Sequence, residues 1–443
     1  MPTFEVPAQY VVSMAVIMVV LHLMLLATAY LIFMERKVAS WIQDRIGPNR
    51  VGLSFGQDNL WRGLRLNFMN TFHFWGLGQA LADGIKLMFK EDYTPPGVDK
   101  TLFRLAPVLV VIPALIGWAV VPWGGLFYFP GMELGPISVP AGWTSVTVAP
   151  VNIGVIYLLA IGSLAVYGVT LGAYASNNKY SFLGGLRATA QMLSYEIPMG
   201  LVVLIMLLTF MTSDAGAMVN LQGGAGGEGA WGIFMHPLLA IIFFICILAE
   251  CNRAPFDLAE AEQELVGGFH TEYASMKWAL FFLGEYIHMI TGSAFFCILF
   301  LGGWDILPFV ADLPVTLGAD APWWMAVGLA VLKFGVFAFK IFLLIFVMMW
   351  VRWTLPRLRF DQLMKLAWRG LVPMMLVAML AMGLIVWLDP DYKGLWFLAA
   401  NIIVGVGAML IGPRMPKGPA VNRRVGLEGS RFSPPHDVAA GSA

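Results

Sequence analysis

Long apolar runs constrain the fold of this chain more than any other feature of its sequence. Crossing the roughly 30 Å hydrocarbon core of a bilayer takes about 20 residues of helix. Nine apolar stretches reach or approach that length: residues 10–34, 104–123, 150–174, 187–212, 233–250, 276–301, 323–350, 371–388 and 394–412. Only 12% of the 443 residues are charged, against about a quarter in a soluble domain. The sequence therefore predicts an all-α integral membrane protein.

Basic residues predict the topology, because they occur in every second connection. Residues 35–104, 175–187 and 351–370 contain lysine and arginine, whereas residues 124–149, 213–232 and 302–322 contain none. Under the positive-inside rule, the basic connections are cytoplasmic. We therefore expect an outside N-terminus, a cytoplasmic acidic stretch at 250–285 and a cytoplasmic C-terminus. The polar segment 413–443 is expected to be a disordered cytoplasmic tail.

The first long connection contains two amphipathic patterns. Apolar residues recur at helical spacing in Leu60–Phe72 and again in Leu77–Phe89. Both patterns predict interfacial helices lying in the membrane plane. Packing on neighbouring subunits or spans is the alternative explanation.

Acidic residues are concentrated in the stretch between the fifth and sixth apolar runs. This stretch contains Glu250, Asp257, Glu260, Glu262, Glu264, Glu272 and Glu285, with only Arg253 and Lys277 as basic residues. A carboxylate at the bilayer centre costs about 2.5–3.5 kcal/mol, so these groups must face water, one another or a polar path. Carboxylates shielded from water exchange protons near neutral pH because their pKa values are raised. If they are open to the cytoplasm, they form only a solvated acidic loop.

A further carboxylate, Glu196, lies within the fourth apolar run in the segment RATAQMLSYEIP. Arg187 and Gln191 are four residues apart, and Ser194 and Tyr195 add hydroxyl groups, so a polar stripe enters the predicted membrane span. A carboxylate inside the membrane is by default a functional candidate. Glu285 is a second candidate of this kind.

The sequence provides no complete redox centre. It has three cysteines and no CxxC motif, whereas an iron–sulfur cluster needs about four thiolates. His22 and His288 could be haem ligands on facing helices, but a polar contact between helices explains them more simply. Metal-ligand clusters and nucleotide motifs are absent from the sequence, and its zero net charge gives no sign of nucleic-acid binding.

Several motifs, in order along the chain, resemble one family. They are ERKVASWIQDRIGPNRVG at 35–52, QALADGIKLMFKE at 79–91, LGGLRATAQMLSYEI at 183–197, AECNRAPFDLAEAEQELVGGFHTE at 249–272, FFLGEY at 281–286 and VRWTLPRLRFDQLM at 351–364. The chain resembles the H-type membrane subunit of bacterial NADH–quinone oxidoreductase (respiratory complex I), equivalent to NADH dehydrogenase subunit 1 of mitochondria. The resemblance covers about residues 10–390.

This resemblance implies eight transmembrane helices around a quinone chamber, as one domain over residues 1–390. Residues 391–412 would add a ninth helix. The implied function is that of a membrane component of a proton-translocating enzyme in the bacterial inner membrane. Quinone would be its substrate, and its partners would be adjacent small membrane subunits and peripheral-arm subunits that hold FMN and iron–sulfur clusters.

The resemblance also assigns residues to the two parts of that machinery. The proton path would comprise Glu196, Glu250, Asp257, Glu260, Glu262, Glu264, Glu272 and Glu285. The quinone chamber or docking surface would comprise Glu35, Arg36, Arg45, Asp83, Lys86, Arg253 and Phe256. No metal site is implied on this chain.

Two other functions are compatible with the sequence. One is the related subunit of a membrane-bound, ion-pumping hydrogenase, which uses no quinone. The other is a free-standing secondary transporter, which predicts inverted repeats. The departures from the family pattern are an extra stretch at Ser54–Gly76, long outer loops, the ninth run with its tail, and Cys251 in place of the usual threonine.

Overall fold

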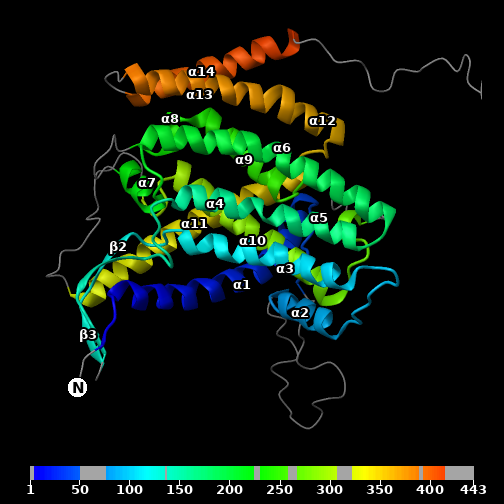
Figure 1. The fold of residues 1–443 in the computed structure, drawn as a ribbon, viewed down its shortest axis with the longest axis horizontal. Coiled ribbons are helices and arrows are strands. Elements are labelled where there is room, and N and C mark those ends of the chain that lie inside the picture. The colour runs from blue at the N-terminus through cyan, green and yellow to red at the C-terminus, as the bar shows by residue number, and fades with distance from the viewer. Residues whose placement is uncertain are drawn as a thin grey trace, which may run out of the picture.

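Long helices that lie side by side form the body of the protein (Figure 1). The computed structural model describes residues 4–49, 76–134, 137–223, 230–257, 267–306, 322–388 and 393–414. Its helices are α1 Ala8–Ile42, α2 Gln79–Phe89, α3 Lys100–Gly117, α4 Gly154–Ser163, α5 Ala165–Ala175, α6 Lys179–Phe210, α7 Ala215–Gln222, α8 Gly232–Met235, α9 Pro237–Glu250, α10 Ser275–Phe300, α11 Trp323–Thr354, α12 Phe360–Lys365, α13 Val372–Leu388 and α14 Lys393–Ile411. Short 3₁₀ turns occur at Trp118–Val120, Gly268–His270 and Gly412–Arg414, and a π turn at Leu366–Leu371 joins α12 to α13.

Every predicted apolar run is helical, which confirms the all-α membrane class. Within the described ranges, eight helical stretches are long and apolar enough to cross a membrane. The run at 233–250 differs, because its helix α9 has only 14 residues and is therefore about 21 Å long. The run at 150–174 is interrupted at Leu164, between α4 and α5.

The second amphipathic pattern is confirmed as α2, on which Leu81 and Met88 are exposed. The first pattern, Leu60–Phe72, lies outside the described residues. So does nearly all of the Ser54–Gly76 stretch.

Five short strands were not predicted: β1 Phe4–Glu5, β2 Leu126–Phe129, β3 Met132–Leu134, β4 Ile137–Val139 and β5 Gly142–Ser145. Strand β2 pairs antiparallel with β5, and β4 lies between β1 and β3. Gly131, with φ of +80°, lies between β2 and β3 and faces Ala141, which lies between β4 and β5. The side chain of Gln9 on α1 donates to the carbonyl of Ser145 at 3.0 Å. The strands are thereby fixed to the N-terminal end of α1 (Figure 1).

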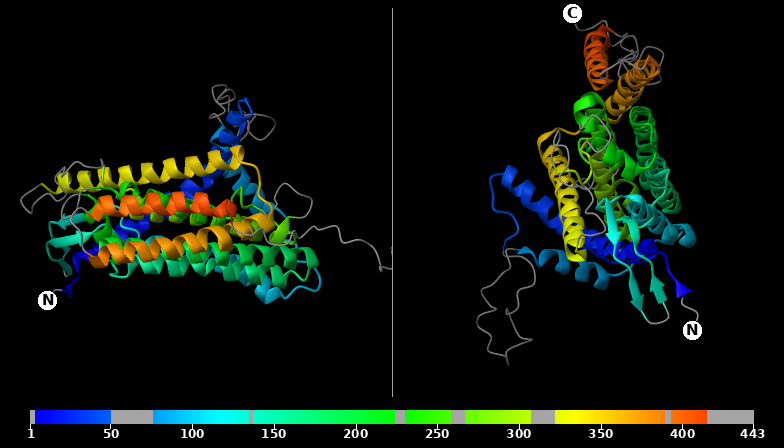
Figure 2. Two further views of the ribbon diagram at one scale, coloured as in Figure 1. Left: turned by 90° about the horizontal axis from the view of Figure 1, so that it is seen from above. Right: turned by 90° about the vertical axis from the view of Figure 1, so that its left-hand side faces the viewer.

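Helices α6, α9 and α10 form the centre of the bundle, where α10 is buried along most of its length. Helices α13 and α14 lie on the side of the bundle opposite α1 and α2 (Figure 2). Asn401 on α14 lies 3.0 Å from Nδ1 of the buried His236, just before α9. The residues predicted as a ninth helix are thus helical and packed on the bundle. The tail from residue 415 lies outside the described residues.

The close contact between α5 and α6 gives a test of the packing. A Cβ atom at Gly185 would clash with the Cβ of Ala173 on α5. We expect Gly185→Ala to destabilise the fold by about 1–3 kcal/mol, because the helices must separate. Thermal unfolding of the detergent-solubilised protein measures this. Gly200→Ala on the same helix is the control, because the added Cβ atom would lie 3.8 Å from its nearest neighbour, a methyl carbon of Leu159. Equal melting temperatures for the two variants would contradict the prediction.

Candidate functional site

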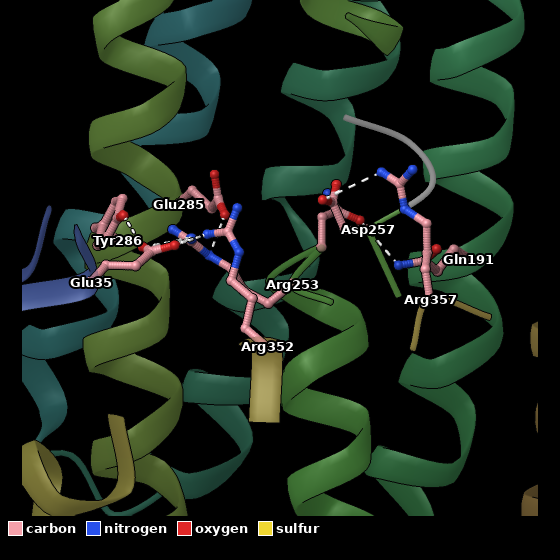
Figure 3. Close-up of polar contacts among 9 residues, drawn as sticks. Glu35, Gln191, Arg253, Asp257, Glu285, Tyr286, Arg352 and Arg357 are labelled. Carbon is pink, nitrogen blue, oxygen red and sulfur yellow. Dashed lines mark hydrogen bonds and ion pairs between the residues drawn. The ribbon is translucent and has the colours of Figure 1, made fainter. Parts of the chain in front are cut away.

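Glu35, near the C-terminal end of α1, is the centre of a buried network of charges (Figure 3). Nη1 of Arg253 lies 3.0 Å from Oε2 of Glu35. Arg352 on α11 makes an ion pair with Oε1, and the hydroxyl of Tyr286 on α10 donates to Oε2. Nε of Arg253 lies 2.5 Å from Oε1 of Glu285, one residue before Tyr286. The network therefore joins two carboxylates and two guanidinium groups.

Arg253 is placed by the turn that ends α9. Asn252 adopts a left-handed conformation, with φ of +48°. Gln191 on α6 donates to the carbonyl of Ala249 at 2.9 Å and to Oδ1 of Asn252 at 3.2 Å. These hydrogen bonds hold the turn in place, so that the side chain of Arg253 extends toward Glu35 and Glu285.

A second ion pair fixes the other end of this turn. Oδ2 of Asp257 lies 3.4 Å from Nη2 of Arg357 (Figure 3). The N–H of Leu358 donates to the carbonyl of Pro255 at 3.1 Å. The segment after α11 therefore holds the segment after α9, and both arginines of the Glu35 network are placed by the same junction.

The charge of Arg253 is compensated within the protein. Burial opposes the charge, but Glu285, Tyr286 and Glu35 together hold the pKa of Arg253 well above its usual range. The guanidinium also lies 4.3 Å from the centre of the Tyr286 ring. A buried charge costs several kcal/mol unless partners of opposite sign surround it. Arg253 is thus a permanent cation between two carboxylates.

A cavity of about 640 Å³ opens beside this network. Its wall contains Ile32, Glu35, Arg36, Ala39, Ser40, Arg45, Pro48, Gly267, His270, Trp278, Phe282, Tyr286, Arg352 and Trp353. The rings of Trp278 and Phe282 are stacked, with centres 5.0 Å apart. Burial lowers the pKa of His270 to about 4, so its imidazole is neutral at neutral pH. The cavity combines flat apolar walls with fixed hydrogen-bond donors.

Two smaller cavities continue from the network into the bundle. Glu285, Glu250 and His288 line one of about 40 Å³. Glu250 and His288 also line the next, of about 30 Å³. Nε2 of His288 lies 3.1 Å from Oε1 of Glu250. Glu196 on α6 lies close enough to Glu250 for the two carboxyl groups to interact electrostatically. Acidic groups therefore follow one another from Glu35 to Glu196.

The other residues predicted for the quinone chamber or docking surface lie in three different environments. Nη2 of Arg36 makes an ion pair with Asp83 on α2 at 3.0 Å, and Arg45 lines the large cavity. Lys86 is exposed on α2. Phe256 is buried against the ring of Tyr195, 5.3 Å away.

Glu272 was predicted as part of the acidic path, but its hydrogen-bond partner is not one of the path residues. Its Oε1 accepts a hydrogen bond, at 2.6 Å, from the side chain of Asn178, which lies directly before α6. The predicted path residues Glu260, Glu262 and Glu264 lie outside the described residues.

Three residues of the site were not assigned a role by sequence reasoning. Arg352 and Tyr286 were used only within motifs or, for Arg352, as a marker of topology. His288 was interpreted as a polar contact between helices in preference to a haem ligand. A buried carboxylate requires a partner of opposite charge, and that requirement could have drawn attention to Arg352. No group of three metal-ligating side chains occurs among the described residues.

Comparison with known proteins places the chain in a family. Residues 14–383 match the family model described as NADH dehydrogenase. This chain belongs to the NADH dehydrogenase family. A Geobacter sulfurreducens relative, named as an H-type subunit of NADH-quinone oxidoreductase, is 41% identical over 386 residues, 86% of this chain and 97% of that relative. A relative from Cytophaga hutchinsonii with the same description is 40% identical over 380 residues, 86% of this chain and 98% of its own.

A third relative, the H-type subunit of NADH-quinone oxidoreductase from Leptospira biflexa, is 42% identical over 352 residues, 79% of this chain and 87% of that protein. As a member of the NADH dehydrogenase family, the chain is a multi-pass membrane component of an oxidoreductase complex. The residues matched by the family model end within α13, so that α14 lies beyond them.

Proposed function

We propose that this protein forms the wall of a quinone chamber, where the membrane arm of the complex meets its peripheral arm. We further propose that an acidic path through its bundle couples quinone reduction to proton pumping by neighbouring subunits. The observation that carries the proposal is the Glu35–Arg253–Glu285 bridge. It connects the large cavity to the series of buried acids in the interior.

The large cavity has the size and chemistry that a quinone headgroup requires. Ligand pockets range from about 300 to 1,000 Å³ and combine apolar walls with a few fixed polar groups. At about 640 Å³, this cavity falls inside that range. The stacked Trp278 and Phe282 offer a flat surface, while the guanidinium of Arg352 carries N–H donors suited to a carbonyl oxygen. The names of the relatives support quinone over the hydrogenase alternative.

Electrostatics explains how reduction could act at a distance. Reduction of a quinone to a quinol takes up two electrons and two protons. The chain's three cysteines are all buried and cannot form a four-thiolate cluster, so the electrons would come from FMN and iron–sulfur clusters on partner subunits. A negative charge in a site of low dielectric acts strongly on nearby ionised groups. Glu35 and Arg253 would be the first to respond, and Glu285, Glu250 and Glu196 would follow.

The docking of partner subunits would involve the segments that border the cavity opening. Helix α2 is joined to α1 by the Arg36–Asp83 ion pair, and Arg45 follows directly after α1. Exposed apolar residues on α2 and exposed basic residues such as Lys86 would give this edge both lipid-facing and partner-facing chemistry.

Filling the chamber tests the first part of the proposal. Ala39 is buried on α1 and lines the large cavity. We expect Ala39→Phe to raise the KM for quinone at least about tenfold, because about 1.4 kcal/mol of lost binding corresponds to that factor. NADH oxidation by a water-soluble artificial acceptor should not change. Assays on membranes containing the whole complex measure both.

The matched control is Ala27→Phe, at an exposed position on the same helix. It adds the same side chain on the outer surface and should leave the KM at the wild-type value. A wild-type KM in Ala39→Phe as well would contradict the chamber assignment.

A further inference from the structure

His288 lies where two internal cavities meet. It is on α10, three residues after Glu285, so both side chains are on one helix face. Glu285, Glu250 and His288 line the cavity of about 40 Å³, and Glu250 and His288 also line the one of about 30 Å³. A buried water needs about 10–15 Å³, so each cavity has room for at least one. Along the acidic series, the imidazole therefore stands between Glu285 and Glu250.

The surrounding helices hold the imidazole close to Glu250. Nε2 of His288 lies 3.1 Å from Oε1 of Glu250. Gly162, at the end of α4, faces this pair. A Cβ atom there would lie 3.1 Å from Oε1 of Glu250 and 3.6 Å from Cε1 of His288. The missing side chain thus lets α4 approach the pair closely.

We propose that His288 transfers protons between Glu285 and Glu250. The proton on Nε2 would pass directly to the Glu250 carboxylate, 3.1 Å away. A protonated Glu285 would deliver its proton to Nδ1 through water in the 40 Å³ cavity. Glu285 thereby loses one proton, Glu250 gains one, and the imidazole carries the same number of protons before and after the transfer. This inference rests on the proposed acidic path and adds to it a residue that is not a carboxylate.

The chemistry of imidazole suits this place better than a second carboxylate would. Its two ring nitrogens accept a proton on one side and release a proton on the other. Near neutral pH it does so without adding negative charge beside Glu250 and Glu196. A purely structural histidine would need only its hydrogen bond to Glu250, and asparagine or glutamine could supply that bond.

The test compares His288→Asn and His288→Gln with wild type in the whole complex, reconstituted into vesicles. Both amides can still donate a hydrogen bond, but neither can carry a proton. We expect NADH-driven quinone reduction coupled to proton pumping to fall at least about tenfold, since a positioned acid–base group contributes about 10²- to 10⁴-fold. The solvent deuterium isotope effect on the remaining turnover should rise, because proton transfer becomes rate-limiting. In His288→Gly, added imidazole should restore part of the rate. His22→Gln, at an exposed histidine on α1, is the control and should match wild type.

Several outcomes would overturn the inference. One is wild-type turnover in His288→Asn. Another is a slower rate with an unchanged isotope effect and no imidazole rescue, which would indicate a structural role. A structural role would also be indicated if the Asn, Gln and Gly variants at position 288 all failed to assemble into the complex. Glu250→Gln separates this inference from the proposed path: if it abolishes coupling while His288→Asn does not, only the histidine step is wrong. If both variants retain coupling, the path is wrong as well.

Discussion

Replacing Arg253 with methionine is expected to destabilise the protein more than any other single change proposed above. Arg253 is 4% exposed and holds both Glu35 and Glu285. Removing one partner of a buried ion pair typically costs about 3–5 kcal/mol, because a buried charge is left without compensation. Glu35 would retain Arg352 and Tyr286, whereas Glu285 would lose this cation. Thermal unfolding of the purified complex and the yield of assembled complex measure the effect.

Arg36→Met is the control for this prediction. It removes the same chemical group from the ion pair with Asp83, in which the Arg36 and Asp83 side chains are 48% and 28% exposed. Exposed pairs typically contribute about 0–1 kcal/mol, so its loss should be small. If the two variants melt at the same temperature, the Arg253 network is not a principal source of stability.

Changing Glu250 to glutamine is expected to give the largest loss of coupled turnover with the fold retained. The glutamine side chain has the same shape and can still bond to His288, so assembly and NADH oxidation by an artificial acceptor should remain normal. It cannot take up a proton, however. Proton-pumping turnover should therefore fall about 100-fold or more, the scale of acid–base catalysis by one positioned group. Quinone reduction and proton uptake by reconstituted vesicles provide the measurement.

Glu133→Gln serves as the control for Glu250→Gln. Glu133 is exposed on strand β3, so the same loss of charge there should leave turnover unchanged. Normal pumping in Glu250→Gln would remove Glu250 from the path. The chamber assignment would be unaffected, because Ala39→Phe tests it separately.

The helices of this protein could be predicted from its sequence, because their formation depends on a local quantity. The transfer of about 20 apolar residues into lipid is favourable wherever they occur in the chain. The nine apolar runs and α2 were therefore found without knowledge of their neighbours. The interruption at Leu164, the shortness of α9 and the strands between residues 126 and 145 were not found, since local composition did not mark them.

Part of the candidate site could also be predicted, because a carboxylate beside lipid is energetically costly and is therefore a functional candidate. That argument drew attention to Glu196, Glu250 and Glu285. It did not show that Glu35 would meet Arg253, or that Arg352 would join them. These pairs are 218 and 317 residues apart in the sequence.

The sequence by itself determined which segments enter the membrane and which acids are kept beside it. Only the tertiary structure decided which charges neutralise one another, and that Arg253 links a large cavity to the interior acids. The physical reason is that the free energy of transfer into lipid is the sum of contributions from single residues. The free energy of a buried ion pair instead depends on distances of about 3 Å, which are set by the packing of α1, α10 and α11 against the turn after α9.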